Sequence, residues 1–289
     1  MKRSKVILLM FLVLSLAACS EAEKTIISLE NENRPEGKLE NTEVINLKYR
    51  SDGHEVTGYI IKPKENHKVS PVLIFNRGGN RDYGMIDINT INYLSGWAQK
   101  GYIVIASQYR GSISKEGQDE FGGSDVNDVM NLVNVAKELP YADTNNIFML
   151  GMSRGGMMAY LAAKKDIQVK AIAVVGGITD LFDTYENRGE DMKSVLEDLV
   201  GNPLLDKQKY IDRSAIFWAD EIKVPTLILH GEDDWRVSVK QANELANKLK
   251  EHNREYKFIS YPKGDHVLNT HFEEVVDEID VWFNEYLNE

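Results

Sequence analysis

Ser153 stands between two glycines in the segment Gly151-Met152-Ser153-Arg154-Gly155, where an apolar run ends and a helical pattern begins. A serine at such a strand-to-helix junction is typical of a nucleophile elbow, in which strained, left-handed backbone holds the hydroxyl out. The two glycines would let the strand and the helix pass closely. Glycine and serine are also common in plain turns, so the motif alone leaves a structural turn as the alternative.

A serine nucleophile requires a general base, and the chain has six histidines. His266 follows the last expected strand and precedes the last expected helix, which places it at the same edge of a sheet as Ser153. His271, at the start of that helix, is the rival, with helix capping as its alternative role. His230 belongs to the apolar run TLILHG and is expected to be a packed histidine. The pattern favours His266 as the base.

The base needs an acid that orients it, and Glu232, Asp233 and Asp234 follow the expected strand that ends at Gly231. A solvated turn accounts for two of these three carboxylates. A hard-cation site would need more oxygen ligands than this segment offers. An acid here completes the order serine, acid, histidine along the chain, which is the order found in α/β hydrolases.

Alternating strand and helix patterns supply the elements that position these residues. Residues 43–51 and 55–63 alternate apolar and polar side chains around Asp52-Gly53, which predicts an antiparallel hairpin. Strands buried on both faces follow, separated by helices. The sequence therefore predicts an α/β fold with a mostly parallel sheet, helices on both faces and an antiparallel N-terminal hairpin. Strands are expected at 72–76, 102–109, 146–152, 171–177, 226–231 and 257–262, and those at 72–76, 171–177 and 226–231 are expected to be buried.

Residues 178–223 interrupt this alternation with a helix-like stretch of unusual length between two strands. Such an excursion is typical of a cap over the carboxyl end of the sheet, within one domain. Its aromatic residues have two alternative roles, either lining a substrate pocket or forming the core of the cap itself. They are Phe182, Tyr185, Phe217 and Trp218.

The N-terminal segment has basic residues, a short apolar run and then Leu16-Ala17-Ala18-Cys19, which is the pattern of an export signal. The run is too short to span a bilayer of ~30 Å as a helix. It resembles a bacterial lipoprotein signal, which implies cleavage of residues 1–18 and lipidation of Cys19; an ordinary signal peptide is the alternative. Residues 19–42 are then expected to be a flexible tether, and 43–289 the catalytic domain. The resemblance implies a protein held by its lipid on the outer face of the cell membrane.

The charge of the chain limits its partners. The formal net charge is −11, and no stripe of basic residues is present. Both features argue against nucleic acid as a partner. Cys19 is the only cysteine, so no disulfide can form within one chain.

From about Leu47 to its C-terminus the chain resembles the catalytic domain of the prolyl-oligopeptidase family of serine hydrolases. Three features beyond the elbow carry the resemblance: the segment YRGSISKEGQDEFGGSDVNDV (109–129), the pattern H-G-x-x-D-x-x-V (230–237), and the glycine shortly before His266. The resemblance implies an α/β-hydrolase fold and a triad of Ser153, Asp234 and His266. The second pattern places the acid on Asp234 instead of Asp233.

The same resemblance implies an oxyanion hole made by the amides of Arg154 and Gly79, with Gly78 or Asn80 as alternatives to Gly79. The family's usual histidine in this loop is replaced by Arg77. Arg77 and Arg81 are either ligands of a substrate carboxylate or solvated loop residues. Arg110 and Asp128 are expected to form a structural ion pair.

The resemblance implies a peptidase that works through an acyl-enzyme without a metal or organic cofactor. Only about 20 residues separate Cys19 from the first expected strand, so the N-terminal propeller of many family peptidases is not expected. This departure leaves two enzyme hypotheses, a peptidase acting on short peptides and a carboxylesterase acting on small or acyl esters. A lipid-anchored binding protein without catalytic activity is the third hypothesis, and it would require a triad member to be missing.

Overall fold

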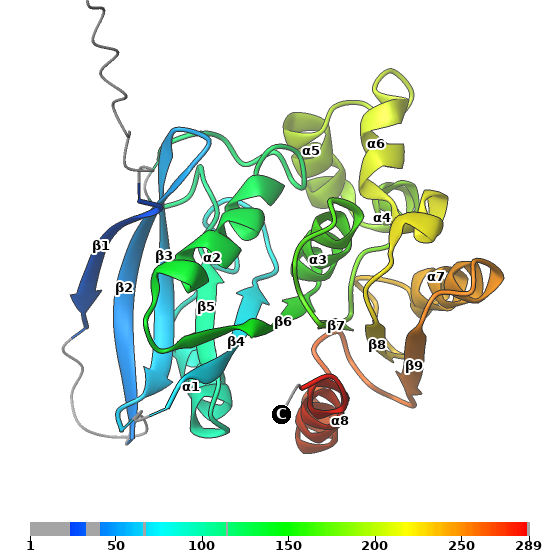
Figure 1. Ribbon diagram of the computed structural model, residues 1–289. Coiled ribbons are helices and arrows are strands. Elements are labelled where there is room, and N and C mark those ends of the chain that lie inside the picture. The colour runs from blue at the N-terminus through cyan, green and yellow to red at the C-terminus, as the bar shows by residue number, and fades with distance from the viewer. Residues whose placement is uncertain (1–23, 33–40, 66–67, 114, 288–289) are drawn as a thin grey trace, which may run out of the picture.

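The computed structural model describes residues 24–32, 41–65, 68–113 and 115–287. The expected signal segment and Cys19 lie outside the described residues. The described part forms one α/β domain built on a twisted sheet (Figure 1). No helix within these ranges has the length and apolar character needed to cross a membrane.

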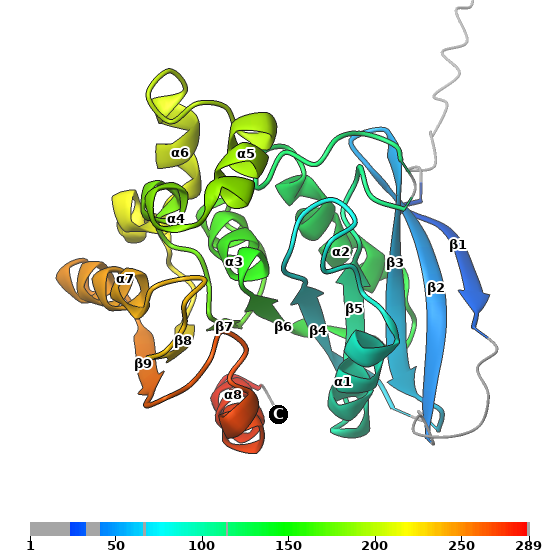
Figure 2. The same cartoon turned by 180° about the vertical axis from the view of Figure 1, so that it is seen from behind.

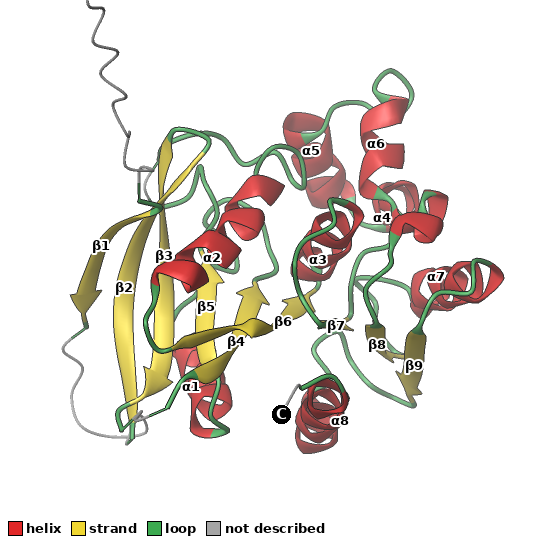
Figure 3. Ribbon diagram, viewed as in Figure 1, coloured by secondary structure: helices red, strands yellow, loops and turns green. Residues whose placement is uncertain are grey.

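The sheet has nine described strands in the order β1-β2-β3-β5-β4-β6-β7-β8-β9. The β2–β3 hairpin is antiparallel around Asp52-Gly53, as predicted. In the strand order given above, every neighbouring pair from β5–β4 to β8–β9 is parallel (Figure 3). The strands are β1 Ile26–Asn31, β2 Thr42–Ser51, β3 His54–Pro63, β4 Ser70–Asn76, β5 Ile103–Ser107, β6 Ala142–Met152, β7 Ala171–Val175, β8 Thr226–Gly231 and β9 Tyr256–Tyr261.

Strand β1 corrects the expectation of a flexible tether over residues 19–42. It pairs antiparallel with β2, from Ile26 opposite Tyr49 to Asn31 opposite Ile45. The Glu138 carboxylate accepts hydrogen bonds from the backbone amides just before and at its start. Most of its side chains are exposed, so the strand is held by main-chain hydrogen bonds to an existing edge. Hydrophobic periodicity does not report that kind of stabilisation.

Two helices cover one face of the sheet and three cover the other (Figures 1 and 2). Successive strand residues explain the two layers: Ile147 and Met149 of β6 pack in one apolar core, whereas Phe148 and Leu150 pack in the other. This alternation is expected of strands buried on both faces. The first face carries α1 (Ile88–Gln99) and α8 (Phe272–Glu285); the second carries α2 (Val126–Glu138), α3 (Arg154–Lys164) and α7 (Val239–Glu251).

The predicted helical insertion is confirmed between β7 and β8, where it packs beside α3 and α7. Aromatic rings of the cap pack against one another: the Phe182 ring lies 5.1 Å from that of Tyr210 and 6.1 Å from that of Phe217, which is exposed. The insertion contains α4 (Leu181–Asn187), α5 (Glu190–Leu199), α6 (Lys207–Arg213) and two short 3₁₀ turns. The Tyr185 ring lies against that of Tyr210, and the Trp218 ring lies under the Lys164 ammonium group.

Candidate active site

Ser153 lies at the tip of a sharp turn between β6 and α3. Its backbone has φ 56° and ψ −122°, so the predicted left-handed conformation is present. Such backbone costs about 1–3 kcal/mol and persists only where the surrounding structure holds it. The flanking glycines are required: a Cβ on Gly155 would lie 1.9 Å from the Asn76 carbonyl oxygen, and one on Gly151 2.3 Å from that of Gly155. The serine is therefore held out on a rigid elbow.

A hydrogen bond joins the side chains of His266 and Asp234, as the sequence predicted. The Nδ1 of His266 lies 2.7 Å from Oδ2 of Asp234, and both side chains are largely buried. The other carboxylate oxygen accepts hydrogen bonds from the amides of Arg236 and Val237, at 2.8 and 3.0 Å. Burial opposes ionisation of this carboxyl, but hydrogen bonds from His230 and His266 hold the pKa of Asp234 well below its usual range. Asp234 is thus a fixed anion behind the imidazole.

His230 is a packed histidine, as predicted, but it also approaches Asp234. Its Nε2 lies 2.8 Å from the Val237 carbonyl oxygen and 3.2 Å from Oδ2 of Asp234. Because a carbonyl oxygen only accepts, this nitrogen must carry the proton. Two imidazoles therefore point at one carboxylate oxygen. The sequence signal for this contact is the spacing of four residues between His230 and Asp234 at a strand end. The sequence analysis predicts only a packing role for His230.

Ser153 and His266 line the same cavity, which has a volume of about 590 Å³. Since Asp234 takes Nδ1, the Nε2 of His266 is available on the cavity side. The rival His271 is not among the residues lining this cavity; its ring nitrogens lie 3.2 Å from the Pro262 carbonyl oxygen and 3.4 Å from Glu274. The structure thus brings together the serine and the histidine that the sequence favoured.

The other two carboxylates of the acidic cluster do not reach the imidazole. Glu232 accepts a hydrogen bond from the Ser260 hydroxyl at 2.9 Å, and both Glu232 and Asp233 are exposed. Within the described ranges, no group of three or more histidine, cysteine, aspartate or glutamate side chains is arranged to hold a metal ion. Two of the three carboxylates therefore belong to a solvated turn.

The loop after β4 passes directly over Ser153. A Cβ on Gly78 would lie 3.1 Å from that of Ser153, and Gly79 has a positive φ of 73° that brings it against Tyr83. The amide of Asn80 donates to the Tyr83 carbonyl at 3.1 Å, so Asn80 is wrong as an alternative oxyanion donor. The amide of Arg154 lies in the first turn of α3, where helical amides have no acceptor within the helix.

Arg77 is neither solvated nor free to bind a substrate carboxylate, which corrects both expectations. Its side chain is 2% exposed, and burial lowers its pKa to about 10. The guanidinium instead holds the loop in place, and Arg81 forms an ion pair with Asp198 of the cap. Arg77 donates to four backbone carbonyl oxygens, those of Gly78, Arg81, Tyr83 and Gln108.

Arg154 has a second, structural task that the sequence did not indicate. Its guanidinium binds Asp119 at 2.7 Å and Asp125 at 2.5 Å, with all three side chains buried. Asp125 stands at the N-cap of α2 but its side chain makes no capping hydrogen bond. Burial raises the pKa of Asp125 although Arg154 is adjacent. Arg110 and Asp128 form the predicted structural pair, with 2.6 Å between Nη2 and Oδ1, and do not line the cavity.

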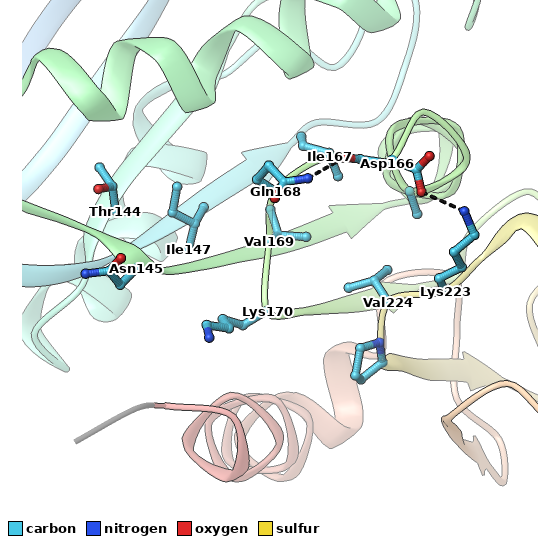
Figure 4. Close-up of a pocket in the computed structure, with 12 residues that line it drawn as sticks. Thr144, Asn145, Ile147, Asp166, Ile167, Gln168, Val169, Lys170, Lys223 and Val224 are labelled. Carbon is cyan, nitrogen blue, oxygen red and sulfur yellow. Dashed lines mark hydrogen bonds and ion pairs between the residues drawn. The ribbon is translucent and has the colours of Figure 1, made fainter.

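A second hollow, of about 500 Å³, lies at the opposite edge of the sheet, around the amino ends of β7 and β8 (Figure 4). Lys223 and Asp166 form an ion pair of 3.0 Å there. None of the described residues lining it is a serine, cysteine or histidine. The candidate nucleophile and base therefore lie at the other edge, around Ser153.

Comparison with known proteins agrees with this arrangement. A sequence profile of the prolyl oligopeptidase family matches residues 89–289. The uncharacterized peptidase YtmA of Bacillus subtilis is 31% identical over 205 residues, which cover 70% of this chain and 78% of that protein. The acylamino-acid-releasing enzyme of Arabidopsis thaliana is 29% identical over 251 residues, or 78% of this chain, but the chain spans only 31% of that enzyme.

Solved structures share the fold. The Pyrococcus horikoshii acylaminoacyl peptidase superposes with a TM-score of 0.73 and 23% identity, covering 87% of this chain and 43% of the other. A puromycin-hydrolyzing peptidase of Mycobacterium tuberculosis gives 0.71 and 21%, covering 89% and 41%. The fold is thus that of the α/β hydrolases, and no propeller is present within the described residues. The chain belongs to the prolyl oligopeptidase family and is a serine hydrolase of the peptidase type.

Proposed function

We propose that Ser153, His266 and Asp234 form a catalytic triad that transfers acyl groups to water. Ser153 Oγ attacks the substrate carbonyl while Nε2 of His266 takes its proton and later gives it to the leaving group. Asp234 fixes the imidazole tautomer and stabilises the imidazolium. Water then repeats the cycle on the acyl-enzyme, with no metal or organic cofactor assigned to either half.

The observation that carries this proposal is the Nδ1–Oδ2 hydrogen bond of 2.7 Å behind a histidine that shares a cavity with Ser153. The depressed pKa of Asp234 supports a carboxylate that remains ionised throughout the working range. We assign the oxyanion hole to the amides of Arg154 and Gly79, with Gly78 as the remaining alternative. One such donor is typically worth about 3 kcal/mol of transition-state stabilisation.

Short peptides are the proposed substrates. The support comes from relatives: YtmA is named a peptidase, and a solved acylaminoacyl peptidase of the same fold was captured with Z-Gly-Gly-Phe-chloromethyl ketone. A carboxylesterase acting on small or acyl esters is the second candidate, favoured by the apolar lining of the cavity beside Ser153. Both reactions pass through the same acyl-enzyme.

The test compares kcat/KM for one acyl group presented as an activated ester and as a matched peptide amide, with Ser153→Ala as the control. Amide turnover within roughly a hundredfold of ester turnover identifies a peptidase, because the leaving amine is then protonated efficiently. Turnover of the ester alone identifies an esterase. If Ser153→Ala hydrolyses both substrates as fast as the parent, the triad is wrong. If the parent hydrolyses neither and Ser153 resists organophosphonates, the non-catalytic binding hypothesis stands.

We also propose that the protein is exported and anchored to the outer face of the cell membrane by lipid on Cys19. The support is the segment Leu16-Ala17-Ala18-Cys19 at the end of a basic and apolar leader. Metabolic labelling with an alkyne fatty acid should tag the parent chain and leave Cys19→Ala unlabelled. Equal labelling of the two chains would contradict the anchor.

A further inference from the structure

The cavity beside Ser153 lies between α1 and α8, whereas the cap packs with α3 and α7 on the other side of the sheet (Figures 1 and 2). Its volume of about 590 Å³ is within the range of about 300–1,000 Å³ that small-molecule sites occupy. The ends of three neighbouring strands contribute Phe75, Met152 and Val175 to its wall. No residue of the cap lines it, so this cavity is separate from any site that the cap would form.

Apolar side chains make up most of the wall. The Phe75 ring lies 6.2 Å from that of Tyr93, which lies 5.9 Å from that of Phe272, both in edge-to-face contact. Val275 and Val276 extend this surface along α8. Phe272 is 50% exposed, so the aromatic wall reaches from the core to the solvent. An apolar group entering here would exchange water for aromatic and aliphatic contacts.

The charged residues around the cavity argue against a cationic occupant of its interior. None of the described lining residues is an aspartate, glutamate or lysine. The Arg77 guanidinium is occupied by backbone carbonyl oxygens, and the partly exposed Arg236 donates to the Tyr83 hydroxyl at 3.3 Å. An amine buried deep in this wall would lose its hydration without gaining a counter-ion.

The position of His266 decides which half of a substrate enters. His266 protonates the leaving group, so the leaving atom must lie beside its Nε2. Val267, Asn269 and Phe272, which follow His266 in the chain, line the same cavity. The acyl and leaving parts point away from each other at the carbonyl carbon, so a leaving group in this cavity leaves the acyl part outside it.

We propose that the cavity between α1 and α8 is a subsite for the leaving group and selects esters or amides whose alcohol or amine part is apolar. This inference rests on the proposed function. As the C–O or C–N bond breaks, its electron pair goes to the leaving oxygen or nitrogen, which takes the proton from His266. The released alcohol or amine occupies the cavity while its acyl group stays bound to Ser153 Oγ.

Acetyl esters of straight-chain alcohols from ethanol to hexanol test the subsite, because their leaving oxygens differ little in basicity. We expect kcat/KM to rise with chain length, by up to about fourfold per methylene. Val276→Phe fills the cavity and should lower the hexyl-to-ethyl ratio at least tenfold. Val281→Phe is the matched control: it makes the same change on the same helix at a residue that is 54% exposed and does not line the cavity.

Calorimetric binding of the same esters to Ser153→Ala separates this inference from the proposed function. Tighter binding of hexyl than ethyl acetate, abolished by Val276→Phe and kept by Val281→Phe, supports the subsite even if the parent chain hydrolyses nothing. Equal binding of all the alcohol lengths overturns the subsite, even when turnover depends on Ser153. A gain in kcat/KM from lengthening the acyl chain, with none from the alcohol, would also overturn it.

Discussion

Two histidines approach the same carboxylate oxygen of Asp234. Oδ2 lies 2.7 Å from Nδ1 of His266 and 3.2 Å from Nε2 of His230. In the proposed mechanism only His266 moves protons, while His230 holds the acid and the Val237 carbonyl in place. Both the ring and the carbonyl it binds are buried. Removing the imidazole would therefore take this donor from the buried Val237 carbonyl, and an unpaired buried acceptor usually costs more than the hydrogen bond itself contributes.

His230→Phe should lower the free energy of unfolding by about 1–3 kcal/mol, because the Val237 carbonyl loses this donor and Asp234 loses one of its hydrogen bonds. Among folded molecules, we expect kcat/KM to fall about tenfold, or about 1.4 kcal/mol of transition-state stabilisation, as Asp234 loses its fixed position. His252→Phe, at an exposed helix end, should change stability by less than about 0.5 kcal/mol. Urea unfolding and steady-state kinetics check both values; equal behaviour of the two variants would contradict the role of His230.

At the scale of elements, the elbow depends on how closely β6 and α3 pass β4. The Asn76 carbonyl at the end of β4 occupies the place where a side chain on Gly155 would stand. The sequence pattern predicted the glycines and their reason, because the motif itself demands small residues there. It did not predict that Arg154 would bind Asp119 and Asp125, since these residues lie 35 and 29 positions away along the chain.

Two glycine-to-alanine substitutions should act in opposite directions. Gly155→Ala places a Cβ 1.9 Å from the Asn76 oxygen, so we expect a loss of about 1–3 kcal/mol in stability and a displaced Ser153. Gly96→Ala, in the interior of α1 with nothing within 4 Å of the new Cβ, should stabilise by about 1 kcal/mol. Thermal unfolding with an activity assay measures both. A stable, fully active Gly155→Ala variant would show that the elbow tolerates a wider separation.

At the scale of the whole molecule, buried carboxylates link stability to pH. Burial alone would raise the pKa of Asp234 in the folded chain. Hydrogen bonds from His230 and His266 outweigh burial and lower this pKa. A carboxyl with a depressed folded pKa contributes stability above the usual aspartate pKa of about 3.9. That contribution is lost as the pH falls through the folded value, because the unfolded chain binds the proton first. Asp125, whose pKa is raised by burial, acts with the opposite sign.

Asp234→Asn should therefore be less stable than the parent at pH 7, and the difference should shrink between about pH 5 and pH 3. In that window the parent chain begins to lose the contribution of Asp234, whereas the variant has none to lose. Urea unfolding of both chains at pH 7, 5, 4 and 3 measures the change. A difference that stays constant over this range would show that Asp234 is not held ionised by its neighbours.

The sequence by itself determined the order of elements, the hairpin at Asp52-Gly53, the helical insertion and the residues that meet at the elbow. These features are written in local patterns: periodicity, turn residues, and motifs whose spacing the chemistry requires. The lipid anchor stays a prediction, because residues 1–23 lie outside the described structure.

Only the tertiary structure decided the roles of Arg77, His230 and Asp125, and it placed the strand Ile26–Asn31 at the sheet edge. It also placed the apolar cavity between α1 and α8. The physical reason is common to all of these. A buried polar group or a cavity wall is defined by partners far away along the chain, and one sequence carries no record of which distant residues will pack together.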